Sequence, residues 1–249
     1  QQTQVERVKQ HWKNWITKWP NIKALASAPR GEVIHAWSGL GYNRRSVNLH
    51  RTAQHIESQY NSKVPIDENI LRELPGIGPY TAAAISCFSA NKKTRPADTN
   101  ITRVIARAFL GLQNSYPDTK KMIQKQLAEL EPNQNFRKHY LALMDLGAVI
   151  CQSRSPSCDL CPWQSKCHWL ERGKPFLQTS KKQSQPFTST ARYARGRIVD
   201  HLRTNSTRTT NEIRRLLPSN HQGHTSIYLE ALAKEGLIEK NKKGWSLPS

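Results

Sequence analysis

Four of the five cysteines in this 249-residue chain fall within one short window, and this feature constrains the fold more than any other. Cys151, Cys158, Cys161 and Cys167 have the spacing C-x6-C-x2-C-x5-C. A close pair flanked by two single cysteines suits a compact loop that wraps a 4Fe–4S cluster held by four thiolates. Structural zinc sites usually combine two separate close pairs, so zinc stays the alternative metal. Cys87, in the apolar segment AAAISCFSA, is expected to be an ordinary buried side chain.

The charge balance indicates a polyanionic partner. The chain has 38 Lys and Arg against 18 Asp and Glu, which gives a formal charge of +20. Such an excess destabilises a compact chain unless a polyanion balances it, and its spread along the chain favours a nucleic-acid-binding face. A generally basic protein without such a partner is the simpler alternative. No apolar run approaches the roughly 18 residues of a membrane span. The polar opening lacks the parts of a signal peptide, so we expect an intracellular protein with no membrane partner.

The pattern of apolar residues predicts a mainly α-helical chain. Apolar residues recur at spacings of three and four from Val5 to Trp19, and Pro20 ends that pattern. Short helices are expected over 22–28 and 31–37, and a longer one over 46–60. The segment GLGYNRR, residues 39–45, interrupts them with two glycines. We predict one domain over 1–170, with its cysteine loop at 151–167.

A second, smaller unit is expected after a linker. Residues 171–190 are rich in Lys, Gln, Ser, Thr and Pro, which is typical of a linker. Residues 191–249 then predict three helices and a terminal hairpin with the turn NKKG, a winged-helix-like α+β pattern. Many such units bind DNA through the third helix and others bind proteins, so both roles stay open.

Two further motifs can carry chemistry. In LPGIGPYTA, Gly76 and Gly78 permit a tight turn and Pro79 suits the first turn of a helix. The amide groups at such a helix start can bind a DNA phosphate, although the motif can also be a packing corner. Asp98 precedes another helix, TNITRVIARAFLG, where its simplest role is that of an N-cap.

Taken together, these motifs resemble the helix–hairpin–helix glycosylase superfamily with a 4Fe–4S loop. The resemblance is greatest to adenine DNA glycosylases of the MutY type. It rests on the cysteine spacing and on QQTQVERV, WSGLGYNRRSVNLH, LPGIGPYTAAAI, DTNITRVIAR and LMDLGAVIC, which cover roughly residues 1–170. The tail from FTSTARYARGRIVDHLR to GWSLP resembles the C-terminal extension of actinobacterial members and not a Nudix-like domain. The implied fold has two helical lobes that bind DNA across a cleft.

The resemblance implies a base excision repair activity. Such an enzyme binds double-stranded DNA, flips out an adenine mispaired with 8-oxoguanine or guanine, and hydrolyses its N-glycosidic bond. Asp98 matches the carboxylate that stabilises the cationic sugar, and Asn100 matches its polar neighbour. Tyr80 stands where bifunctional members have a nucleophilic Lys, so a monofunctional enzyme is expected. The resemblance also implies a monomer in the bacterial cytoplasm, associated with the nucleoid.

The resemblance assigns DNA contacts to two further segments. The expected residues are Gln2 and Thr3 at the mispair, Leu40 and Tyr42 beside the oxidised guanine, and Gly76 and Gly78 at a phosphate.

The sequence departs from the family at three points. Asn43 replaces a second aromatic residue that often follows GLGY, and Leu141 stands where several relatives have Gln or Glu. The family's general acid is a Glu four positions before the first Gln of QQTQ, which here is Gln1. We therefore expect that acid, and roughly the family's first helix, to precede the present chain.

Two other functions remain open from the sequence. One is a thymine or uracil mismatch glycosylase of the same superfamily, which would share the hairpin, Asp98 and the cysteine loop. The other is a non-catalytic iron–sulfur DNA-binding protein in which Asp98 only caps its helix.

Overall fold

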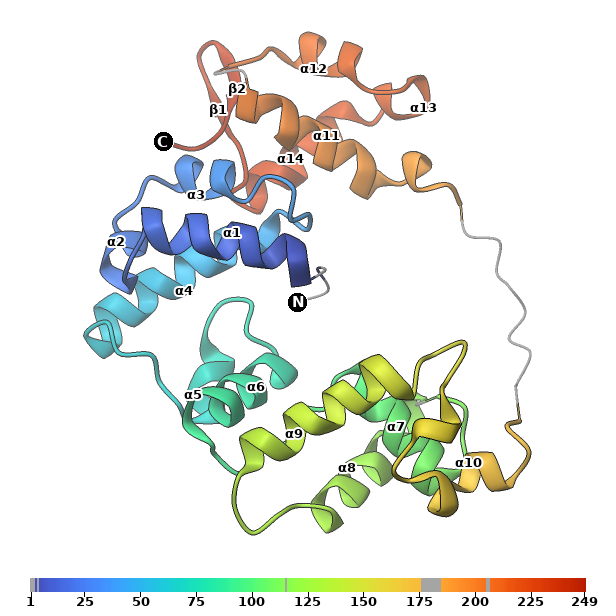
Figure 1. The fold of residues 1–249 in the computed structure, drawn as a ribbon. Helices are drawn as coiled ribbons and strands as arrows, with labels where there is room; N and C mark the ends of the chain where they lie inside the picture. The colour runs from blue at the N-terminus through green and yellow to red at the C-terminus, as the bar shows by residue number, and fades with distance from the viewer. Residues whose placement is uncertain (1–2, 4, 115, 176–184, 205–206) are drawn as a thin grey trace. The chain divides into compact units, whose positions relative to one another are not determined.

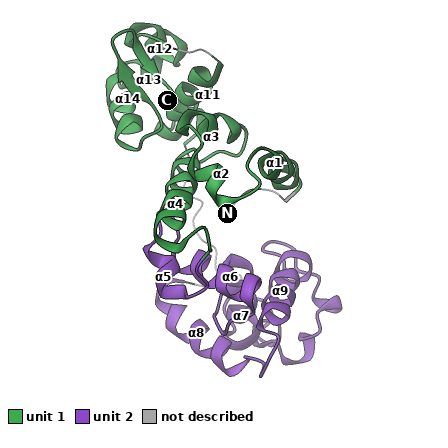
Figure 2. Cartoon of the chain, turned by 90° about the vertical axis from the view of Figure 1, so that its left-hand side faces the viewer, with its two compact units in different colours: residues 1–64, 181–249 green, residues 65–180 purple. Residues whose placement is uncertain are grey.

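A computed structural model describes residues 3, 5–114, 116–175, 185–204 and 207–249. The chain forms two compact units, unit 1 from Gln1–Val64 and Lys181–Ser249 and unit 2 from Pro65–Ser180 (Figures 1 and 2). Helices dominate both units, and the sheet found within the described ranges is a single pair of short strands. The expected mainly α fold is confirmed. Within those ranges, no helix combines the length and the apolar character needed to cross a membrane.

The described residues of the N-terminal part of unit 1 form four helices. They are α1 (Val5–Lys18), α2 (Ile22–Ala26), α3 (Arg30–Ala36) and α4 (Arg44–Tyr60), close to the predicted ranges. Asn21 caps α2 by accepting a hydrogen bond from the Ala24 amide. Trp19, Leu25, Val33 and Ala53 form a small apolar core between these helices.

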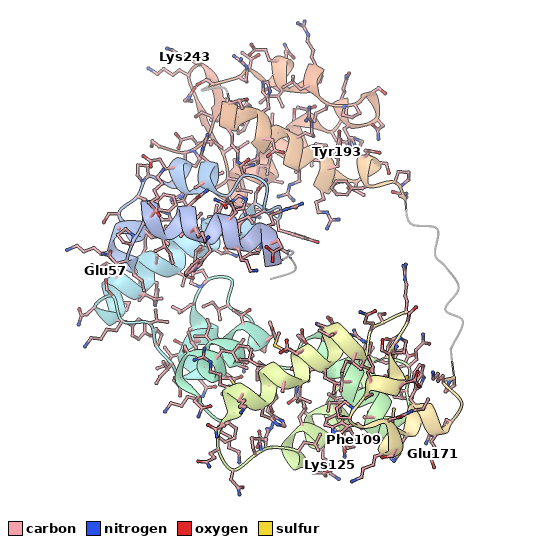
Figure 3. All side chains as sticks on the ribbon, in the orientation of Figure 1. Glu57, Phe109, Lys125, Glu171, Tyr193 and Lys243 are labelled. Carbon is pink, nitrogen blue, oxygen red and sulfur yellow. The ribbon has the colours of Figure 1, made fainter. Side chains whose placement is uncertain are left out.

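The C-terminal part of unit 1 has the predicted winged-helix pattern. It contains α11 (Ala191–Thr204), α12 (Thr210–Leu216), α13 (Ser219–Gln222), α14 (Thr225–Lys234), β1 (Glu239–Asn241) and β2 (Gly244–Ser246). Lys243 lies at the turn between the two strands (Figure 3), where Asn241 Oδ1 accepts hydrogen bonds from the amides of Lys243 and Gly244. Gly236 follows α14 with a left-handed φ of 77°, which ends the helix. The short helix α13 and a β-bridge from Arg208 to Trp245 were not predicted.

This C-terminal part shares one core with α3 and α4. Ile34 and Val47 lie in the same buried cluster as Ile198, Leu229 and Trp245. A Cβ on Gly31 would lie 2.2 Å from the Pro248 carbonyl oxygen, so the last residues approach α3 too closely for any other side chain. The compact units therefore divide the chain differently from the predicted 1–170 domain and 191–249 unit. Within the predicted linker at 171–190, residues 176–184 lie outside the described part.

Unit 2 is built from α5 (Glu68–Glu73), α6 (Pro79–Ala90), α7 (Thr99–Leu110), α8 (Lys120–Glu129), α9 (Phe136–Asp145) and α10 (His168–Glu171). A single π-helical turn, Leu146–Ile150, continues α9 into the cysteine loop. The core includes Ile101, Ile105, Leu127 and Tyr140. Cys87 is fully buried in the same core, as predicted, and burial raises the pKa of its thiol.

Candidate active site and nucleic-acid interface

The glycine hairpin joins α5 to α6 as the sequence predicts. Gly76 has a left-handed φ of 76°, which only glycine adopts without strain. Gly78 is the N-cap of α6 and Pro79 is its first residue. A Cβ built on Gly78 would meet no heavy atom within 4 Å, so the approach to this helix start is open. The hairpin therefore offers the open, positively polarised helix end that a phosphate requires.

Asp98 caps α7 with both of its carboxylate oxygens engaged. Oδ1 accepts a hydrogen bond of 2.7 Å from the Ile101 amide, and Oδ2 accepts one of 3.2 Å from Asn100 Nδ2. The side chain is only partly buried, so the carboxylate is fixed and still accessible. Tyr80, in the first turn of α6, lies in the field of this carboxylate. Burial and then the Asp98 charge raise the pKa of the Tyr80 phenol, which keeps it neutral.

Arg103, one turn further along α7, connects this site to the chain that follows α9. Its guanidinium donates to Asn100 Oδ1 at 2.9 Å, to the Gly147 carbonyl at 2.6 Å and to the Cys151 carbonyl at 2.9 Å. Burial lowers the pKa of Arg103, and the Cys151 thiol and then Asp98 oppose that shift. Gly147 allows this approach, because a Cβ there would lie 2.7 Å from Asn100 Cβ. Asn100 is thus held between Asp98 and Arg103.

Arg107 makes a similar connection to the cysteine loop. It is 1% exposed, and its guanidinium carbon lies 4.5 Å from the centre of the Trp169 ring. It donates to the carbonyls of Gln113, Gln152 and Ser153 at 2.8 to 2.9 Å. Its Nη1 also lies 3.5 Å from Cys151 Sγ. Sequence reasoning missed Arg103 and Arg107, although their spacing from Asn100 places all three on one helical stripe.

The four loop cysteines line one small cavity, together with Arg107 and Trp169. All four are partly buried. Burial raises the pKa of the Cys161 thiol, a hydrogen bond with the Trp163 backbone opposes that shift, and the other three cysteines raise the pKa further. Among the described residues, no three His, Cys, Asp or Glu side chains are grouped around a point that could hold one metal ion. Phe109 of α7 (Figure 3) contacts Trp163 of the loop edge to face, with 5.4 Å between ring centres.

The remaining predicted DNA contacts lie in unit 1. Gly39, Gly41 and Tyr42 all have left-handed φ values, so the loop after α3 presents Tyr42 to solvent. Arg45 holds this loop by donating to the carbonyls of Leu40 at 2.9 Å and Gly41 at 3.2 Å.

Arg45 also connects Thr3 to this loop. It donates to Thr3 Oγ1 at 3.2 Å, so Thr3 and Leu40 have a common partner that the sequence analysis did not single out. Gln2 lies outside the described residues. Asn43, the departure from the family pattern, accepts a hydrogen bond of 2.9 Å from Arg203 of α11.

Comparison with known proteins places this geometry in a family. Residues 1–132 match the family described as HhH-GPD superfamily base excision DNA repair protein. The chain is also 37% identical over 244 residues to an adenine DNA glycosylase of Mycolicibacterium smegmatis, covering 98% of this chain and 82% of that protein. The chain belongs to the adenine DNA glycosylase family. Within this family, it is 39% identical over 206 residues to the Mycobacterium tuberculosis protein, covering 82% of this chain and 67% of that one.

A solved structure of another DNA glycosylase has a similar fold. A thermostable thymine-DNA glycosylase superposes with a TM-score of 0.64 and 29% identity, over 69% of this chain and 80% of the other. The resemblance inferred from the motifs is therefore confirmed. The matched range 1–132 contains the hairpin, Tyr80, Asp98 and Asn100, while the cysteine loop lies beyond it.

Proposed function

We propose that this chain removes adenine mispaired with 8-oxoguanine or guanine in double-stranded DNA, by hydrolysis of the N-glycosidic bond. The observation that carries this proposal is the accessible Asp98 carboxylate, fixed by Ile101 and Asn100 beside an open phosphate-binding hairpin. The adenine DNA glycosylases among its relatives favour adenine over thymine or uracil as the excised base. The protein acts as a monomer on the bacterial chromosome.

Asp98 stabilises the charge that develops on the sugar. As the bond to adenine breaks, the sugar becomes an oxocarbenium-like cation, and a fixed carboxylate lowers the energy of that state selectively. Because its hydrogen bonds already orient both oxygens, the carboxylate needs little reorganisation during the reaction.

Tyr80 makes the reaction monofunctional. A lyase needs an amine that forms a Schiff base with the sugar, and a phenol cannot form one. A tyrosine phenol is protonated at neutral pH, and burial and the Asp98 charge raise the pKa of Tyr80 further, so the side chain can donate a hydrogen bond near Asp98. We expect adenine release without strand cleavage.

The decisive experiment compares Asp98→Asn with Asp67→Asn in the full-length protein. Asp67 caps α5 in the same way, by accepting from the amides of Asn69 and Ile70. Asn can keep the N-cap bond in both variants. In Asp98→Asn, however, an amide NH₂ would face Asn100 Nδ2, and the negative charge is lost. Adenine release should fall about 100- to 1000-fold in Asp98→Asn.

The binding and stability controls separate catalysis from capping. Both variants should keep their affinity for the mispaired duplex, and Asp98→Asn should lose only about 1 kcal/mol of unfolding free energy. Equal rates of adenine release in the two variants would show that Asp98 is only a helix cap and would overturn the proposal.

The cysteine loop is proposed to hold a 4Fe–4S cluster through Cys151, Cys158, Cys161 and Cys167. The four thiols line one cavity, and the buried Arg107 supplies positive charge beside Cys151. One zinc ion would need all four sulfurs about 2.3 Å from a single point. The preference for an iron–sulfur cluster over zinc rests on the cysteine spacing, in which one close pair is flanked by two single cysteines. When bound, the cluster would cross-link the loop and fix its position against α7.

Metal analysis tests this assignment without reference to activity. Protein purified without oxygen should contain about four irons and absorb visible light through its iron–thiolate bonds. Cys161→Ser should lose both signals, whereas Cys87→Ser should keep them because Cys87 lies in the helical core. Stoichiometric zinc without iron would overturn the proposal.

A further inference from the structure

The chain that leads from α6 to Asp98 is a loop, and its course sets the position of that carboxylate. We call residues 91–97, which lie between the end of α6 and the N-cap of α7, the Asp98 loop. Near its end the Ala97 amide donates a hydrogen bond of 2.8 Å to the Arg95 carbonyl, which makes a tight turn. Pro96, inside this turn, is buried. A displacement of the turn would therefore carry Asp98 with it.

A nearly buried carboxylate from another part of unit 2 holds this loop. Glu131 lies in the connection between α8 and α9 (Figure 1), and its side chain is 5% exposed. Arg95 Nε lies 2.7 Å from Glu131 Oε1, and Arg95 Nη2 donates to Glu131 Oε2 at 3.2 Å. Lys93 Nζ lies 3.4 Å from the same Oε2. Two cations of the Asp98 loop thus converge on one carboxylate.

The Arg95–Glu131 pair lies against the core of unit 2, unlike an ordinary surface ion pair. Tyr140 of α9 is fully buried in that core. Burial and then the Glu131 charge raise the pKa of the Tyr140 phenol, and Arg95 opposes that shift. A carboxylate so little exposed to solvent depends on its partners, because the loss of one partner leaves a poorly solvated charge. The pair therefore has little freedom to separate.

A second contact attaches the Asp98 loop to the same region, but further from the carboxylate. Asn91 Oδ1 accepts a hydrogen bond of 2.9 Å from the Arg137 amide at the start of α9. Asn91 precedes Asp98 by seven positions, whereas Arg95 precedes it by three. The contact made by Arg95 is therefore the one that bears on the position of Asp98.

We propose that Glu131 is a positioning residue for base release, which holds Asp98 in its catalytic place through Arg95. A fixed carboxylate acts on the developing cation only at the right distance, and a displacement of about 1 Å can slow a reaction about 100-fold. Glu131 is itself too buried to contact a duplex, so its loss should affect the rate and not the binding of DNA. The inference rests on the proposed function of Asp98.

The test separates the rate of base release from DNA affinity in the full-length protein. Glu131→Gln nearly keeps the size of the side chain, and Glu129→Gln is its control, because it removes the same charge from an exposed site on α8. Single-turnover release of adenine from an 8-oxoguanine:adenine duplex gives the rate. Affinity is measured on the same duplex with 2′-fluoro-2′-deoxyadenosine, whose fluorine disfavours the sugar cation. Both are measured at a temperature at which circular dichroism shows every variant to be folded.

Glu131→Gln should slow base release about tenfold and change duplex affinity less than about twofold. Glu129→Gln should change neither by more than about twofold. Arg95→Gln should repeat the loss of rate, and Arg95→Lys should restore part of it, since it keeps the charge but not the planar fork. If Glu131→Gln does not fold, the two Arg95 variants decide the matter, because the Arg95 side chain is 37% exposed and tolerates replacement better.

Two further measurements show whether Glu131 acts through Asp98. In the Asp98→Asn background, Glu131→Gln should slow release no further, because the carboxylate that it positions is gone. Hydrogen exchange then reports on Asp98 without catalysis. The Ile101 amide, which Asp98 caps, should exchange about tenfold faster in Glu131→Gln, relative to the Ile70 amide that Asp67 caps.

Equal rates of base release in Glu131→Gln and Glu129→Gln would refute the inference. An undiminished effect of Glu131→Gln in the Asp98→Asn background would refute it as well, because Glu131 would then act independently of Asp98. Failure of the proposed function gives a different result, in which the wild-type protein binds the mispaired duplex and releases no adenine. In that case the exchange of Ile101 relative to Ile70 decides whether Glu131 positions Asp98, and an unchanged ratio means that it does not.

Discussion

At the scale of single residues, this site depends on where backbones can approach one another. Asn100 holds Asp98 on one side and accepts from Arg103 on the other. Gly147 lies against Asn100, and its missing side chain is what allows the turn after α9 to pack there. The position of the Asp98 carboxylate therefore depends partly on a glycine in the turn after α9.

Gly147→Ala should disturb this arrangement. The new Cβ would lie 2.7 Å from Asn100 Cβ and 2.9 Å from its carbonyl oxygen, so the backbone must move. We expect a loss of about 1–3 kcal/mol in unfolding free energy and slower adenine release. Gly196→Ala on α11 is the control, because its Cβ would meet nothing within 4 Å. Gly196→Ala should stabilise the protein by about 0.5–1 kcal/mol. Thermal and chemical unfolding measure both variants, and a Gly147→Ala protein at least as stable as Gly196→Ala would contradict the prediction.

At the scale of elements, the helix starts are the features most directly encoded in the sequence. Thr209 and Glu212 form a capping box at the start of α12, in which the Thr209 hydroxyl accepts from the Glu212 amide and Glu212 Oε2 accepts from the Thr209 amide. The bonds to the backbone and then to the side chain of Thr209 lower the pKa of Glu212. The charged form of Glu212 is thus favoured by folding.

This cap should make α12 sensitive to acid. Because folding lowers the pKa of Glu212, its stabilising effect is complete above the ordinary glutamate value and is lost as the pH falls through the lowered value. Glu212→Gln can keep the hydrogen bonds but does not titrate. The stability advantage of the wild type over this variant should shrink between about pH 6 and pH 3. A difference in unfolding free energy between the wild type and Glu212→Gln that stays constant over that pH range would contradict the assignment.

Sequence patterns predicted the elements much better than their long-range partners. Periodicity and caps gave α1, α4, the hairpin at Gly76 and Gly78, and the winged-helix pattern, because these depend on neighbours in the chain. They did not predict Arg103 or Arg107, since a buried arginine on a helix has the same spacing as an exposed one. The contact from Arg192 to Tyr42 spans 150 positions, and no local pattern encodes it.

At the scale of the whole molecule, charge governs the encounter with DNA. The formal charge of +20 is spread over both units, and exposed cations are abundant on each. Binding to a duplex releases condensed counterions in proportion to the phosphates neutralised. The affinity for duplex DNA should therefore fall steeply as the salt concentration rises.

We expect duplex affinity to fall at least about 100-fold between about 50 and 200 mM salt. A titration by fluorescence anisotropy at several salt concentrations gives the slope of log affinity against log salt. Normal and mispaired duplexes should have similar slopes, because phosphate contacts carry no sequence information. A slope near zero would mean that the positive charge does not contact DNA.

The shared core of unit 1 has a consequence for synthesis on the ribosome. Ile34 and Val47 are made about 200 residues before Trp245, which lies in the same cluster. Unit 2 is continuous in the chain and can fold while the tail is still being translated. The side chains of Ile34 and Val47 stay unburied until Trp245 is translated, which takes roughly 10 to 40 s. The nascent chain is therefore vulnerable to aggregation at α3 and α4, and chaperones that bind apolar segments during translation should raise its yield.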